Sequence, residues 1–246
     1  MHSIKWHIGC SGFHYKEWKE AFYPRGLAQS KWFDYYAQHF NTLELNVTFY
    51  RFPTLASLKT WHDKAPEGFC FSAKVPRAIT HFKKFEETER MLEDFYGLLK
   101  EGLDEKLACV LFQLPPQFSF SKEKLENILR QMNPAFTNVI EFRHESWWRH
   151  DVPLMLQKNH VSFCGVSFPR IPFDDTVINT PVCYYRFHGV PRLFYSEYHN
   201  AFLEKIFHQI QENKTVRQAF LYFNNTASLA ALHNARYFQH LVANNF

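Results

Sequence analysis

Short apolar runs recur along the chain, and eight of them end in polar residues. Apolar runs of about four to eight residues, bounded by turn residues, are typical of buried strands. Helix-compatible segments separate most of these runs, and strands that alternate with helices indicate a parallel sheet of βαβ units. The predicted strands are Lys5–Gly9, Asn41–Val47, Phe69–Lys74, Leu107–Gln113, Asn138–Arg143, Val161–Val166, Val182–His188 and Ala219–Asn224.

Eight such units predict an α/β fold, the closed (β/α)8 TIM barrel. The length of 246 residues is close to the ~250 typical of one such barrel, so we expect residues 1–246 to form a single domain. Helices are expected from near Ser30, over Thr54–Lys64 and Tyr198–Asn213, and from near Thr226. The segment Phe168–Asp175 is the weakest helix candidate, and a lid or an irregular crossover is the alternative.

Side chains of a strand alternate between its two sides, and segment 41–47 shows this clearly. Thr42, Glu44 and Asn46 share one side, and three apolar residues share the other. The apolar side would face the helices, so the polar side points into the barrel. In this fold catalytic groups lie at the C-terminal ends of the strands. We therefore expect one opening lined by Glu44, Asn46, Lys74, Glu141, Arg143, Arg186, His188 and Asn224.

Net charge and cysteine content limit the kinds of ligand, metal site and cellular location that we expect. The net charge of +4 permits an anionic ligand and gives no reason to expect a membrane partner. The five cysteines are odd in number and contain no CxxC pair, which disfavours structural zinc and a disulfide framework. The first predicted strand begins at Lys5, so we expect no signal peptide and a cytoplasmic location. The oligomeric state is not indicated.

An ordered set of motifs carries a family resemblance. The motifs include Gly9-Cys10-Ser11-Gly12 with Tyr15 and Trp18, Phe22-Tyr23-Pro24, Glu44 to Tyr50, Lys74 with Thr80-His81, Gln113-Leu114-Pro115, Glu141 to Trp147, Arg186 to Gly189 and Phe223-Asn224-Asn225. Over nearly the whole chain this set resembles the YecE-like family, bacterial and archaeal TIM-barrel proteins catalogued as a domain of unknown function, number 72. The chain departs from the family after the paired Asn, where Thr226-Ala227-Ser228 replaces the frequent acidic or His residue and Gly.

The resemblance implies a TIM barrel with the polar residues lining its upper mouth, and it implies no established reaction. Such barrels are similar in fold to metal-dependent apurinic endonucleases and sugar isomerases. That analogy suggests nucleic acid as a ligand, although one barrel supports many chemistries.

Carboxylates and histidines are the candidate proton-transfer groups. Glu44 and Glu141 could form an acid and base pair, or each could be held by a cation in a buried ionic network. His188 and His144 could move protons. Together with Glu141 and His81 they also offer nitrogen and oxygen ligands for a divalent metal, which is the weaker alternative. The cofactor requirement is therefore left open.

Cations and aromatic rings are the candidate binding groups. Lys74, Arg143 and Arg186 could hold a phosphate or a carboxylate. Tyr15 and Trp147 are the best candidates for stacking on a sugar or a base. Cys10 at a strand end is interpreted as a structural residue rather than a nucleophile.

The leading hypothesis is a hydrolase or lyase that acts on a phosphorylated or nucleic-acid-derived substrate at the barrel mouth. Its proton-transfer residues would be Glu44, Glu141 and His188. Its substrate-binding residues would be Tyr15, Asn46, Lys74, Arg143, His144, Trp147, Arg186 and Asn224. One alternative is a sugar-active enzyme that uses Glu44 and Glu141. The other is a module that binds nucleic acid or a metabolite without turnover.

Overall fold

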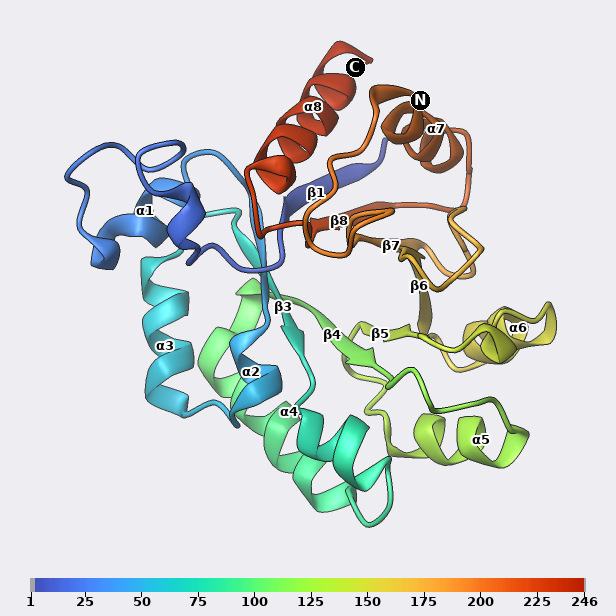
Figure 1. The fold of residues 1–246 in the computed structure, drawn as a ribbon. Helices are drawn as coiled ribbons and strands as arrows, with labels where there is room; N and C mark the ends of the chain where they lie inside the picture. The colour runs from blue at the N-terminus through green and yellow to red at the C-terminus, as the bar shows by residue number, and fades with distance from the viewer. Residues whose placement is uncertain (1–2, 246) are drawn as a thin grey trace. The chain divides into compact units, whose positions relative to one another are not determined.

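Eight parallel strands pair in chain order into a closed barrel, as the computed structural model of residues 3–245 shows (Figure 1). The predicted TIM-barrel fold is therefore confirmed. The strands are β1 (Lys5–Cys10), β2 (Thr42–Leu45), β3 (Cys70–Lys74), β4 (Leu107–Gln113), β5 (Asn138–Glu141), β6 (Ser162–Ser167), β7 (Val182–Phe187) and β8 (Gln218–Phe223).

Helices follow most of the strands. They are α1 (Trp32–Tyr36), α2 (Val47–Tyr50), α3 (Leu55–Lys64), α4 (Glu89–Leu103), α5 (Lys122–Gln131), α6 (Asp151–Lys158), α7 (Asn200–Gln211) and α8 (Ala230–Asn244). A π-helix covers Ala78–Lys83, and 3-10 turns cover Lys16–Trp18, Gln29–Lys31, Asp104–Lys106 and Glu145–Trp147. Thr54 begins α3 as predicted, because its hydroxyl accepts a hydrogen bond from the Ser57 amide at 3.2 Å. Residues 168–181, all within the described chain, form no helix, so the crossover is irregular, and a lid role for this segment stays a prediction.

Several strands end earlier than predicted. The prediction that β2 continues to Val47 is wrong, because Val47 begins α2 and its side chain is 58% exposed. The Thr48 hydroxyl donates to the Leu45 carbonyl at 2.9 Å and to the Lys74 carbonyl at 2.6 Å, which turns the chain away from the sheet. Similarly, β5 ends at Glu141, β7 at Phe187 and β8 at Phe223. The candidate residues Asn46, Arg143, His188 and Asn224 therefore lie just after strands rather than within them.

Contacts divide the chain into two compact units, Met1–Glu44 with Cys164–Phe246, and Leu45–Phe163. In the first unit, β8 pairs with both β1 and β7, and rings fill the space beneath α7 and α8. Phe187 and Phe223 stack there with centroids 4.4 Å apart, and Phe238 lies 6.3 Å and 6.4 Å from them. The prediction that the whole chain forms a single domain stays a prediction.

In the second unit, β3, β4 and β5 pair side by side, and α3 packs against α4. A glycine in α4 permits this helix contact, because a Cβ on Gly102 would lie 2.5 Å from the Leu58 Cβ. Among residues 3–245, no helix is both long enough and apolar enough to cross a membrane.

Candidate functional site

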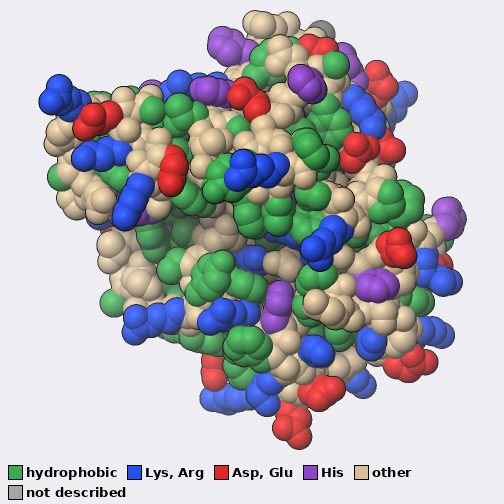
Figure 2. Space-filling view, in the orientation of Figure 1, with side chains coloured by type: hydrophobic (Ala, Val, Ile, Leu, Met, Phe, Trp, Pro, Cys, Tyr) green, Lys and Arg blue, Asp and Glu red, His purple; other side chains and the backbone are tan. Residues whose placement is uncertain are grey.

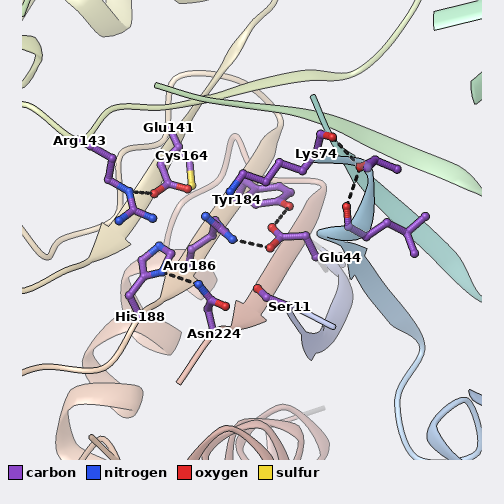
Figure 3. A network of polar contacts seen from close by, with 12 residues as sticks. Ser11, Glu44, Lys74, Glu141, Arg143, Cys164, Tyr184, Arg186, His188 and Asn224 are labelled. Atoms are coloured by element: carbon purple, nitrogen blue, oxygen red, sulfur yellow. Dashed lines mark hydrogen bonds and ion pairs between the residues drawn. The ribbon is translucent and has the colours of Figure 1, made fainter. Parts of the chain in front are cut away.

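Glu44 is the centre of a buried polar cluster in the first unit. The Tyr184 hydroxyl donates to Glu44 Oε2 and Arg186 Nη2 donates to Glu44 Oε1, each at 2.6 Å (Figure 3). Tyr184 and Arg186 fall on the same side of β7, two residues apart, so strand alternation aims both at one carboxylate. None of the three side chains is more than 1% exposed. A buried charge needs such partners, and this geometry fits the structural interpretation of Glu44.

His188 and Asn224 form a second pair in the same unit. Asn224 Nδ2 donates to His188 Nδ1 at 2.8 Å (Figure 3). Main-chain bonds hold both residues, since the His188 amide donates to the Ser167 carbonyl at 3.0 Å and the Asn224 amide donates to the Phe187 carbonyl at 2.8 Å. A side-chain amide nitrogen only donates, so in this arrangement His188 Nδ1 accepts and Nε2 is the ring nitrogen that carries a proton. From Nε2 such an imidazole can donate a hydrogen bond.

Cys10 is the last residue of β1, and Tyr15 follows this strand. The Tyr15 hydroxyl donates to the Ser11 carbonyl at 2.5 Å, and its ring packs on Trp18 with centroids 4.9 Å apart. Tyr15 is half-buried, and its stacking on a ligand stays a prediction. Burial raises the pKa of the Cys10 thiol far above its usual range, which fits the structural interpretation of this residue.

In the second unit, Lys74 is the last residue of β3 and Glu141 is the last residue of β5. Both strands pair with β4. Arg143 Nε donates to Glu141 Oε1, and the Glu141 side chain is fully buried (Figure 3). The Lys74 ammonium lies 3.9 Å from the centroid of the Phe49 ring, a cation–π contact, and Lys74 is 7% exposed. Since α2 is bonded to the Lys74 carbonyl through Thr48, the ring that covers Lys74 is held in place.

His81, on the π-helix, belongs to this second cluster although it was predicted only as an alternative metal ligand. Its pKa is lowered to about 4, first by burial and then by the positive charges of Lys74, Arg143 and Arg77, while Glu141 acts in the opposite direction. The imidazole is therefore neutral at pH 7, and its Nδ1 lies 2.9 Å from Thr80 Oγ1. Single π-helical turns are frequent at functional sites, but the sequence contains no clear signal for one.

Trp147 was predicted to stack on a ligand, and the structure corrects this. The ring is fully buried between Phe118 and Phe142, which stack at centroid distances of 6.0 Å and 4.4 Å. Phe120 meets it edge-on, and the indole Nε1 donates to the Phe118 carbonyl at 2.6 Å. Because it is fully buried, Trp147 is a core residue.

His144 caps a 3-10 turn, and Asn46 stands before α2 without a side-chain cap bond. His144 Nδ1 accepts from the Ser146 amide at 3.2 Å and lies 2.8 Å from the Ser146 hydroxyl, so it caps the turn Glu145–Trp147. Asn46 precedes α2 and is half-buried. Within residues 3–245, no group of three or more His, Cys, Asp or Glu side chains is arranged to hold a metal ion.

The depressed pKa of His81 predicts how stability depends on pH. Between about pH 6.5 and pH 4 the unfolded chain binds a proton that folded His81 does not, so the unfolding free energy should fall as the pH is lowered through this window. His7, with a pKa also lowered to about 4 by burial and Lys5, acts with the same sign. His81→Gln should therefore reduce the slope without abolishing it.

Urea unfolding at several pH values between 4 and 7 measures this slope. His208→Gln, an exposed histidine on α7, is the matched control and should keep the slope of the parent protein. An unchanged slope in His81→Gln would show that His81 is not held neutral by its surroundings.

A family model described as "Protein of unknown function DUF72" matches residues 7–246. The chain belongs to the DUF72 family. Two curated relatives of this DUF72 chain are the UPF0759 protein YunF of Bacillus subtilis and the UPF0759 protein YecE of Escherichia coli K12. They are 31% and 25% identical over 52% and 46% of the chain. The match spans about half the length of these relatives, 48% and 42%.

Solved structures from the same family are similar over their whole length. A DUF72 protein from Thermotoga maritima superposes with a TM-score of 0.87 at 26% identity, covering 97% of this chain and 99% of that one. A DUF72 protein from Enterococcus faecalis gives 0.80 at 20% identity, covering 99% of each chain. The second similarity, at this identity, concerns the fold alone.

Proposed function

We propose that this DUF72 protein is an enzyme, a hydrolase or lyase, that binds the phosphate of a phosphorylated or nucleic-acid-derived substrate beside His81. One observation carries the proposal: three cations, Lys74, Arg143 and Arg77, lower the pKa of His81, and Glu141 acts in the opposite direction. A site with this excess of positive charge favours an anion. Arginine adds a planar fork that matches phosphate oxygens.

Glu141 is the proposed proton-transfer group. A phosphate that accepts hydrogen bonds from Arg143 competes with Glu141 for the same guanidinium. Once released, the Glu141 carboxylate can take a proton from a nucleophile or return one to a leaving group. Lys74, as a point charge, balances the negative charge of the substrate. Neutral His81 supplies a hydrogen-bonding group that adds no charge of its own.

In the first unit, we assign a structural role to the Glu44–Arg186 pair and a proton-transfer role to His188. Both oxygens of Glu44 accept hydrogen bonds, one of them from Arg186, so this pair fits the structural alternative better than acid–base or phosphate-binding work. This weakens the sugar-active alternative, which needs Glu44 as a proton-transfer group. His188, held by Asn224, remains a proposed proton-transfer residue.

Arg143→Met tests phosphate binding directly. Loss of a charged hydrogen bond should weaken the binding of inorganic phosphate about 10-fold or more, measured by titration calorimetry. In the parent protein, phosphate should also raise the pKa of the His81 imidazole in an NMR titration, because a nearby negative charge favours its protonation. Arg149→Met, which breaks an exposed pair with Asp151, is the matched control and should leave both values unchanged.

Equal phosphate affinity in Arg143→Met and the parent, or an unmoved His81 pKa, would contradict the proposal. Turnover is sought in a screen of phosphodiesters, abasic and single-stranded DNA, and aryl glycosides, each with and without divalent metal. If none reacts while oligonucleotides bind with a steep salt dependence, the binding-module alternative replaces the enzyme.

A further inference from the structure

Arg77 lies between two aromatic rings on the surface of the second unit. Its guanidinium carbon is 5.5 Å from the centroid of the Tyr50 ring and 5.3 Å from that of Phe82. Tyr50 is 65% exposed and Phe82 is 69% exposed. Two exposed rings on either side of one guanidinium offer faces on which a flat ligand can stack. We call Tyr50, Arg77 and Phe82 the stacking platform.

The platform stands on two well-anchored segments. Tyr50 ends α2, which Thr48 bonds to the Lys74 carbonyl at 2.6 Å. Phe82 belongs to the π-helix Ala78–Lys83, and the chain just after it is held at the Phe85 carbonyl. That carbonyl accepts hydrogen bonds from Asn127 Nδ2 at 2.9 Å and from Gln131 Nε2 at 2.8 Å. Segments whose backbone is held in this way lose little freedom when a ligand binds to them.

Ring contacts connect the platform to the proposed phosphate site. The Phe49 ring lies 5.1 Å from Tyr50 and 5.0 Å from His81, and the Lys74 ammonium is 3.9 Å from its centroid. All of these residues belong to the second unit, so the surface rings and the His81 surroundings form one continuous set of contacts.

The two chain segments that carry the platform are basic. Arg51, Lys83 and Lys84 are exposed beside the platform residues, and segments 46–54 and 76–84 contain no acidic residue. Figure 2 shows Lys and Arg side chains next to hydrophobic ones in the region of α2. Aromatic faces surrounded by cations suit a ligand that carries both flat rings and negative charge.

We propose that the stacking platform binds the bases of a single-stranded nucleic acid, with a phosphate of the strand entering the site beside His81. This inference rests on the proposed function and names its substrate. Stacking on protein aromatics contributes about 5- to 150-fold in affinity per base and tolerates any sequence, since every base has a flat face. A duplex hides these faces, which is why the structure favours a single strand.

Fluorescence anisotropy with a labelled oligothymidylate of about 12 nucleotides tests the platform. An abasic strand of equal length and charge separates stacking from electrostatics. The parent protein should bind oligothymidylate more tightly than the abasic strand. The double variant Tyr50→Ala/Phe82→Ala should weaken oligothymidylate about 10-fold or more and leave the abasic strand and inorganic phosphate unaffected.

A matched control exists in the first unit, where Arg192 lies 4.1 Å from the ring centroid of Tyr195, which is 45% exposed. Tyr195→Ala removes an equivalent surface pair and should leave oligothymidylate binding unchanged. Circular dichroism and melting check that each variant is folded, which the exposure of all three positions should permit.

Three results would overturn the inference: oligothymidylate binding unaltered in the double variant, equal binding of the abasic strand, or thymidine monophosphate binding as tightly as the strand. The two proposals fail separately. If phosphate does not bind beside His81 but oligothymidylate still depends on Tyr50 and Phe82, the proposed function and the placement of the strand's phosphate are wrong, and only base stacking on the platform stands. If Arg143→Met weakens phosphate while the double variant changes nothing, only the platform is wrong.

Discussion

Arg186→Met should lower the unfolding free energy by about 3–5 kcal/mol, because it leaves the buried Glu44 carboxylate without its cation. Glu44 is fully buried and Arg186 is 1% exposed, so water cannot replace the lost hydrogen bond at Glu44 Oε1. Chemical denaturation at pH 7 measures the change. The double variant Glu44→Gln/Arg186→Met should recover part of the loss, since it also removes the unpaired charge.

Arg149→Met is the surface comparison for this experiment. Arg149 and Asp151 are about half exposed, and an exposed pair contributes about 1 kcal/mol at most. A loss of less than 1 kcal/mol in Arg186→Met would mean that Glu44 does not depend on this cation, and Glu44 would then return as a candidate proton-transfer group.

Glu141→Gln should reduce turnover by roughly 10²–10⁴ while substrate affinity changes little, once the screen has supplied a substrate. The amide keeps the size of the carboxylate and can still accept the hydrogen bond from Arg143, but it cannot exchange a proton at neutral pH. Steady-state kinetics separate the effect on kcat from that on KM. Glu145→Gln, an exposed neighbour in the chain, should be neutral. A kcat within a few-fold of the parent would limit Glu141 to holding Arg143.

The fold could be predicted from the sequence because apolar runs and their terminators mark each strand. The clearest case is β4, whose bounds Leu107–Gln113 match the prediction, since Pro115 and Pro116 cannot continue the sheet. The prediction for β2 ran past its end because Val47 is a good strand residue. What ends the strand is a side-chain bond from Thr48 to Lys74, 26 positions away, which no local pattern reveals.

The candidate site was predicted less completely than the fold. Alternation identified Glu44 and Arg186 on facing strands of one unit, and Glu141 beside Arg143 in the other. Strand alternation alone could not show whether a carboxylate already accepts hydrogen bonds from other side chains. Trp147 was misassigned because aromatic residues are abundant, and only packing distinguishes a buried ring from an exposed one. The pairing of Tyr50 with Phe82 across Arg77 depends on a π-helix, and so it was not predicted.

The connection between β6 and β7 contains no helix, and this leaves a segment whose length can vary. Pro169, Arg170, Pro172 and Phe173 are exposed. Beyond them the chain is fixed again, where the Tyr185 hydroxyl donates to the Asp174 carbonyl at 2.5 Å and the Thr176 amide to Gln209 Oε1 at 3.0 Å. Extra residues placed before Asp174 would extend into solvent without displacing a packed helix. The segment therefore offers a position for an inserted epitope or fluorophore that leaves the sheet undisturbed.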